Sequence, residues 1–186
     1  MPVIILLVIF AAIAFWLIRT YNGLIRLRHR RTNAFNDINT LLKQRHDLIP
    51  QLVETVKAYT GNERNLLQKV TEARSAAVSA TTIEDKMKAE QLLTTALRAT
   101  NVQFEAYPDL KCNQNFLKLQ EELNNIEYRL ASTRPAFNNA TMEYNNAIEK
   151  FPSTLIASNF DFTKEPMFDL GTEKRIEIED PPKVSV

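Results

Sequence analysis

The sequence predicts an all-α protein in which an N-terminal transmembrane helix continues into an elongated antiparallel four-helix bundle. Three observations support this prediction. The first eighteen residues carry no charged side chain, apolar residues recur in long heptad rows, and only three glycines occur in 186 residues. Glycine is scarce where long helices replace the tight hairpin turns of sheets. We therefore expect helices along most of the chain.

Residues 1–18 form the predicted transmembrane anchor. As a helix they reach about 27 Å, roughly the thickness of a hydrocarbon core. Trp16 and Tyr21 fall where an aromatic belt would lie at the membrane–water interface. A cleaved signal peptide is the alternative, but such peptides carry their positive charge first and end at small residues. No basic residue precedes this run, and Trp16 and Leu17 occupy the cleavage position, which favours an uncleaved anchor.

A basic juxtamembrane segment, residues 19–34, follows the anchor. It holds no carboxylate and five arginines, namely Arg19, Arg26, Arg28, Arg30 and Arg31. We expect these at the membrane surface, where each gains about 1 kcal/mol from anionic lipids. Because arginine-rich flanks stay cytoplasmic, the N-terminus is predicted outside and the helical domain inside the cell. Nucleic-acid binding is the competing interpretation, but such a patch would not need to lie beside an anchor.

The remaining composition is consistent with a helical domain in a reducing compartment. The net charge of the chain is +1, so the residues after the basic segment sum to about −4 once its five arginines are subtracted. The single cysteine, Cys112, permits no disulfide within the chain.

The first helix is predicted to run almost unbroken from about residue 3 to 59. Arg45 falls on its apolar row and must find a carboxylate or carbonyls, or lie at an opening in the bundle. Pro50 removes a hydrogen bond from the carbonyl of His46, which predicts a kink near residues 46–50. The row consists of Phe35, Ile38, Leu42, Ile49, Leu52, Val56 and Tyr59.

Three more helices complete the predicted bundle over residues 35–151. The second spans about 63–80 and begins after Gly61 and Asn62, which suit a helix end and a helix start. The third begins near Glu84 and ends before Pro108. The fourth carries large residues at intervals of seven, with Pro135 predicting a bend near 131–135. Its row consists of Phe116, Leu123, Leu130, Phe137, Tyr144 and Phe151.

The helices differ in length, which bears on self-association. The soluble parts of the first and fourth run to nearly 40 residues, and the other two to about 20, so the long pair extends beyond the short pair. The apolar rows of that overhang are covered either by another chain or lipid, or by each other as a coiled coil. Residues 152–170 are predicted as an extended aromatic segment packed on the bundle, and residues 171–186 as a mobile tail.

Several motifs resemble those of the bacterial LemA family. They include the stretches 21–28, 43–50 and 52–59, the Leu119–Leu123 block and the aromatic ending around Phe168. The resemblance implies a single-pass membrane protein with an elongated antiparallel helical domain. Asn39 and Pro135 depart from the family pattern. The motif positions, which are also candidate partner contacts, are Tyr21, Asn22, Arg45, His46, Asp47, Pro50, Tyr144, Asn145, Phe151, Pro152, Phe160 and Phe162.

The sequence predicts no catalytic, cofactor-binding or metal site. His29 and His46 are the only histidines, and they lie about 25 Å apart along one helix, too far to share a metal. Adjacent helical residues point about 100° apart, so His46 and Asp47 do not form a catalytic pair. We expect Arg45, His46 and Asp47 to make structural contacts around the carbonyl freed by Pro50.

Two functions therefore remain, neither of them enzymatic. The first is a scaffold in the bacterial cytoplasmic membrane that forms homo-oligomers and organises membrane or envelope proteins. The alternative is an adaptor whose Arg45–Pro50 region and aromatic ending dock a membrane protease or cell-envelope factor. The expected partners are the lipid bilayer, including anionic lipid, further copies and such a protein, but neither nucleic acid nor a small-molecule substrate.

Overall fold

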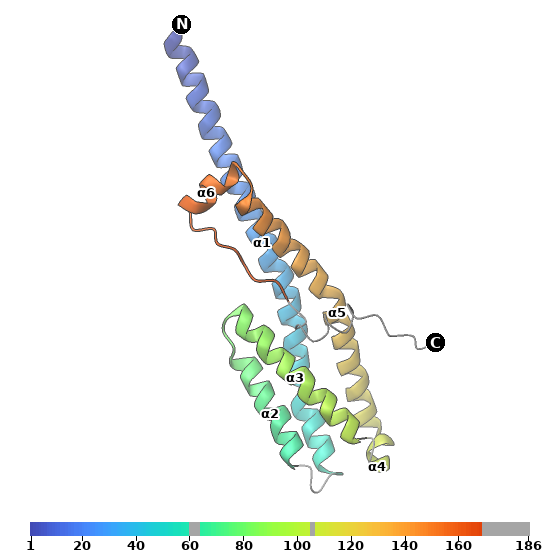
Figure 1. The fold of residues 1–186 in the computed structure, drawn as a ribbon. Helices are drawn as coiled ribbons and strands as arrows, with labels where there is room; N and C mark the ends of the chain where they lie inside the picture. The colour runs from blue at the N-terminus through green and yellow to red at the C-terminus, as the bar shows by residue number, and fades with distance from the viewer. Residues whose placement is uncertain (60–63, 105–106, 169–186) are drawn as a thin grey trace, which may run out of the picture. The chain divides into compact units, whose positions relative to one another are not determined.

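The computed structural model of the chain describes residues 1–59, 64–104 and 107–168 (Figure 1). Every regular element in these ranges is a helix, which confirms the all-α prediction. The helices are α1 (Pro2–Lys57), α2 (Arg64–Ser79), α3 (Ile83–Phe104), α4 (Pro108–Lys111), α5 (Gln114–Glu149) and α6 (Ser153–Asn159).

The four long helices lie where the sequence predicts them, and two short helices are additional. Thr82 begins α3 as its cap, because its Oγ1 accepts a hydrogen bond from the backbone N–H of Asp85 at 3.0 Å. Pro50 and Pro135 lie inside α1 and α5 without ending them, so the predicted bends stay predictions. The turn at 60–63 and the tail at 171–186 fall outside the described residues.

Helix α6 corrects the prediction of an extended segment over residues 152–170. Ser153 Oγ donates to the carbonyls of Ala147 and Lys150 at 2.7 and 2.8 Å, at the end of α5. One helical turn then places Ile156 and Ala157 together in the core. Residues 163–168 contain no regular element, as predicted for the aromatic ending.

The chain forms two compact units. The first combines residues 1–39 with 132–167, and the second combines residues 40–131 with Phe168. Their boundaries fall inside α1 and α5, so these two helices contribute residues to both units.

In the first unit, α1, α5 and α6 share one core. Its buried members are Leu24, Tyr144, Ile148, Ile156, Ala157 and Phe162. The rings of Phe35 and Phe137 lie 5.6 Å apart and extend the contact between α1 and α5. Phe151, which the heptad row places inside, is instead 75 % exposed.

The N-terminal part of α1 is apolar and uncovered. None of its most apolar window is buried within the protein, and the helix is long and apolar enough to cross a membrane. This confirms the predicted N-terminal apolar helix. A run of this length without a polar face does not match a helix that packs against a soluble core.

In the second unit, one core draws on five helices. Buried side chains come from α1, α2, α3, α4 and α5, and the rings of Phe104 and Phe116 meet edge to face at 5.3 Å. Ile49, Leu52 and Val56 of the predicted α1 row are buried here. The row ends at Tyr59, which is exposed and accepts a hydrogen bond from Asn113 at 2.7 Å. The antiparallel order of the bundle stays a prediction.

Candidate functional site

Arg31 is a buried ion-pairing residue of the first unit. Only 5 % of it is exposed, and its guanidinium lies 3.1 Å from the Glu165 carboxylate. It also donates to Thr141 Oγ1 at 3.2 Å and to the Pro166 carbonyl at 3.3 Å, and it lies over the Phe137 ring. The prediction that Arg31 lies at the membrane surface is therefore wrong, because these partners hold it inside the protein.

The other four basic positions remain on the outside. Arg19, Arg26 and Arg28 are exposed, and Arg30 is exposed with its guanidinium paired to Glu143. An exposed pair of this kind adds little stability. The exposed arginines of the basic segment are therefore these four.

Asn145 forms two hydrogen bonds with the backbone of Glu165. Its Nδ2 donates to the Glu165 carbonyl at 2.9 Å, and its Oδ1 accepts from the Glu165 N–H at 3.0 Å. The amide of a single buried side chain thus replaces a strand partner for this extended backbone. Residue 165 is thereby held where its carboxylate reaches Arg31.

Tyr144 lies beside this ion pair and is buried. Burial raises the pKa of its phenol above the ordinary value of 10, and the Glu165 carboxylate acts in the same direction. Arg28 and Arg31 act against this rise. Burial lowers the pKa of Arg31, whereas Glu165 and Tyr144 raise it.

Aromatic residues contact one another just after the apolar start of α1. The Tyr21 ring meets Phe160 at 5.0 Å and Phe162 at 5.8 Å, both edge to face. The structure therefore brings Tyr21 against two motif residues that follow it by about 140 positions in the sequence. Trp16 is about one and a half turns earlier and 37 % exposed.

Arg45 is the centre of a buried polar network in the second unit. Its guanidinium donates to Glu90 Oε2 at 2.6 Å and to Glu127 Oε2 at 2.9 Å. It also reaches Thr94 Oγ1 at 3.1 Å and the Glu90 carbonyl at 3.2 Å. Arg45 is 2 % exposed and Glu90 3 %, so each charge depends on the other for compensation. The prediction that Arg45 finds carboxylates and a carbonyl is confirmed.

The network extends through His46 to α2. His46 Nε2 lies 2.5 Å from Glu90 Oε1. The carbonyl of His46, which Pro50 deprives of its helical partner, accepts a hydrogen bond from Arg74 Nε at 2.7 Å. The predicted contact around the freed carbonyl is thus confirmed. Asp47, which was predicted to share these contacts, is instead exposed and lies outside this network.

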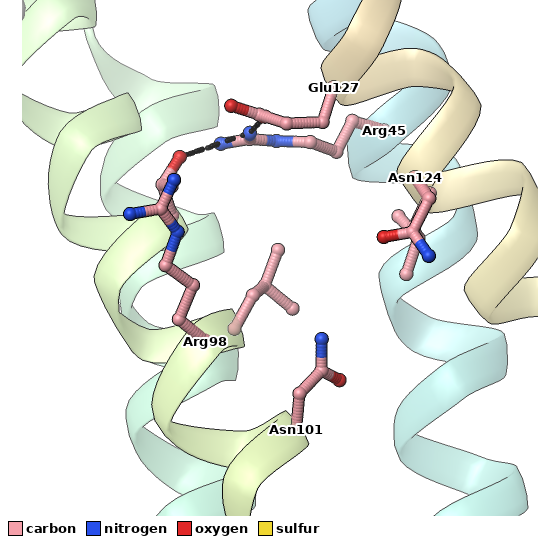
Figure 2. Close-up of a pocket in the computed structure, with 8 residues that line it drawn as sticks. Arg45, Arg98, Asn101, Asn124 and Glu127 are labelled. Atoms are coloured by element: carbon pink, nitrogen blue, oxygen red, sulfur yellow. Dashed lines mark hydrogen bonds and ion pairs between the residues drawn. The ribbon is translucent and has the colours of Figure 1, made fainter.

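A small pocket opens beside Arg45 (Figure 2). Arg98 and Asn101 of α3 and Asn124 of α5 lie around it, below the Arg45–Glu127 pair. Its volume is about 110 Å³, well below the roughly 300 Å³ at which small-molecule sites begin. Within the described part of the chain, no three His, Cys, Asp or Glu side chains are grouped as metal ligands.

The remaining motif residues lie apart from both networks. Pro50 and Asn22 are exposed, and Pro152 is partly buried in the turn before α6. The motif therefore divides between two sites. Tyr21, Tyr144, Asn145, Phe160 and Phe162 belong to the first unit, and Arg45 and His46 to the second.

The acidic partners were not predicted, although the sequence carries a signal for Glu90 and for the burial of Arg31. Glu90 lies on the apolar row of α3, followed by Leu93, Leu97, Thr100 and Phe104 at helical spacing. A carboxylate on one apolar row matches an arginine on another. Arg31 likewise lies fourteen residues before Arg45 on the same α1 row. Glu165, in an irregular segment, has no such periodic signal.

The comparisons with known proteins give a family and a relative. The family model described as LemA family matches residues 34–185. Protein LemA of Metamycoplasma hominis is 25 % identical over 161 residues, which cover 85 % of this chain and 73 % of the relative. The matched range includes Arg45, Glu90, Asn145 and Glu165.

Proposed function

The chain belongs to the LemA family, as its motifs indicate, and we propose that it is a non-enzymatic membrane scaffold that self-associates. It is anchored in the bacterial cytoplasmic membrane by residues 1–18, with the helical units on the cytoplasmic side. In this role it organises membrane or envelope proteins. The single observation that carries the proposal is the uncovered apolar start of α1.

The anchor is continuous with folded structure. Residues 2–57 form one helix, whose apolar start is uncovered and whose later residues enter buried cores. Lipid is the solvent that suits such a start, since apolar surface of this size is costly in water. A helix without an intervening loop links the membrane mechanically to the buried Arg31 and Arg45 networks, as a scaffold requires.

An exposed stripe on α3 supports self-association. Leu92, Thr95, Ala99 and Val102 follow the alternating spacing of three and four that defines a coiled-coil seam, and all four are exposed. Leu92 is 64 % and Val102 71 % exposed. A second copy would bury this uncharged stripe against its own.

The oligomeric state tests this proposal. We expect the full-length protein in detergent to form a discrete assembly by light scattering, and Leu92→Lys with Val102→Lys to dissociate it. Gln91→Lys with Gln103→Lys is the matched control, because it adds the same charges at exposed positions beside the stripe. A monomeric unmodified protein would rule out the scaffold. Equal dissociation by both pairs would rule out the stripe as the contact.

An adaptor is the second candidate, and one observation favours it. Nε of Arg45 is buried and finds no acceptor among the described residues, and Arg45 lines the open pocket. A side chain of a partner, such as a membrane protease or envelope factor, would enter this pocket beside Arg45. Of the contacts proposed for an adaptor, Arg45 and Phe162 are buried within the fold, whereas Asp47, Pro50 and Phe160 are exposed. A monomer that binds a partner through this pocket, with loss of binding in Asn124→Trp, would favour the adaptor.

A further inference from the structure

We propose that α6 and its flanking aromatic residues form a second membrane-contacting element that lies in the lipid headgroup region beside the anchor. The inference deepens the proposed function, because it rests on residues 1–18 crossing the bilayer. It assigns a ligand, the bilayer interface, to an apolar surface that faces away from the core. This surface consists of Phe151, Leu155 and Phe160.

The surface is apolar and exposed, and its Phe160 also contacts Tyr21 of α1. Phe151 is 75 %, Leu155 56 % and Phe160 59 % exposed. The core contacts of this region come from other side chains, Ile156, Ala157 and Phe162, which are buried. Two large aromatic residues and a leucine within ten positions exceed the scattered single exposure that is ordinary for a protein surface.

The position of the surface identifies its occupant. The Phe160 ring lies 5.0 Å from the Tyr21 ring, and Tyr21 follows the last anchor residue, Ile18, by three residues, or about 4.5 Å along the helix. Tyr21 is thus at the level of the interface if the anchor spans the bilayer. Phe160 is held at that same level, and Leu155 and Phe151 precede it by only five and nine residues.

The orientation of α6 fits an interfacial element. In Figure 1, α6 runs across the direction of α1 rather than along it. Elements in the interface lie in the membrane plane with apolar side chains buried about 5–10 Å into the headgroup and acyl boundary. The last described polar side chains of α6, Ser158 and Asn159, are exposed and bond their own helix carbonyls. They therefore tolerate the polar headgroup layer.

Depth measurement with a single label tests the inference. The native Cys112 is replaced by serine, and Leu155→Cys in the full-length protein is labelled with an environment-sensitive fluorophore and reconstituted into phosphatidylcholine–phosphatidylglycerol vesicles. We expect blue-shifted emission, and stronger quenching by lipids with a doxyl group near the headgroup than by lipids with a doxyl group at the tail end. Val78→Cys, at a position on α2 that is exposed to the same extent as Leu155, is the control and should show neither effect.

Two outcomes at position 155 would overturn the inference, and one further label tests the anchor separately. Water-like emission at position 155 would overturn the inference. Blue-shifted emission without quenching by any lipid would also overturn it, because the surface would then be covered by protein, such as a second copy. A label at Ile9→Cys separates this failure from failure of the proposed anchor. That label should be quenched most by tail-end doxyl lipids whether or not α6 touches the membrane.

Discussion

Each of the two units contains one buried arginine that is paired with a carboxylate. Arg31 and Arg45 lie on the same heptad row of α1, which also carries Leu24, Ile38 and Leu52, and all five are at most 5 % exposed. An arginine at such a position is tolerated only with a carboxylate, here Glu165 for Arg31 and Glu90 for Arg45. We infer that the Arg45–Glu90 pair selects the register of α1 against α3, because an apolar row alone permits a shifted alignment.

Removing Arg45 should destabilise the second unit strongly. In Arg45→Met the Glu90 carboxylate stays buried without its main partner, a change that costs about 3–5 kcal/mol. Arg45→Met with Glu90→Leu should recover part of this loss, because no uncompensated carboxylate remains at position 90. The measurement is urea unfolding followed by circular dichroism. Arg98→Met, at an exposed position of the same pocket, serves as the control.

One outcome of these unfolding measurements would contradict the role of the Arg45 network. If Arg45→Met and Arg98→Met lowered the unfolding free energy equally, the buried network would not be what holds α1 to α3.

Tyr144 should make the stability of the first unit sensitive to high pH. Its pKa is raised above 10 in the folded state, mainly by burial, so folding favours the neutral phenol. This contribution is fully present below pH 10 and is lost as the pH rises through the folded-state pKa. We expect the unfolding free energy to fall less steeply above pH 10 in Tyr144→Phe than in the unmodified protein. Tyr128→Phe, at a position that is 77 % exposed, should retain the original slope.

Only part of this residue-level arrangement could be predicted from the sequence. The unusual position of Arg45 on an apolar row indicated that a carboxylate must meet it, and Pro50 indicated that the His46 carbonyl needs a donor. The identity of the partners depends on which helices face each other, which no local pattern encodes. Arg31 was assigned to the membrane because five arginines follow the anchor closely, and its true partner, Glu165, is 134 positions away.

At the scale of elements, long helices are predictable and short ones are not. The rows of α1, α3 and α5 repeat over many turns, so periodicity alone locates them. Helix α6 has seven residues, too few for a periodic pattern. It forms because Ser153 bonds to carbonyls at the end of α5 and because Ile156 and Ala157 find a core. These conditions exist only in the folded protein.

The irregular segment after α6 should depend on Asn145. In Asn145→Ala the backbone of Glu165 loses two hydrogen bonds, each worth about 0.5–1.5 kcal/mol. We expect faster amide hydrogen exchange at Glu165 and faster tryptic cleavage after Lys164, with α5 intact. Asn146→Ala alters the exposed neighbouring amide and should leave both rates unchanged. Unchanged exchange in Asn145→Ala would show that other contacts hold the segment.

At the scale of the whole molecule, the central claim is that one helix passes from lipid into folded protein. The apolar run was evident from composition, because an uncharged stretch of eighteen residues is rare outside membranes. The division into two units was not evident, since it falls inside α1 and α5 where no loop or change in composition marks it. The side of the membrane on which the helical units lie, and the proteins that they bind, depend on the cell rather than on the fold.

Cys112 provides the most direct test of this claim, because it is the sole cysteine and is exposed. Intact spheroplasts that express the protein are treated with a membrane-impermeant maleimide, before and after lysis. In Cys112→Ser with Pro2→Cys, the label should attach without lysis, because the proposed orientation puts the N-terminus outside. We expect Cys112 of the unmodified protein to react only after lysis. Labelling of Cys112 in intact spheroplasts, or no labelling at position 2, would contradict a helix that crosses the membrane with its N-terminus outside.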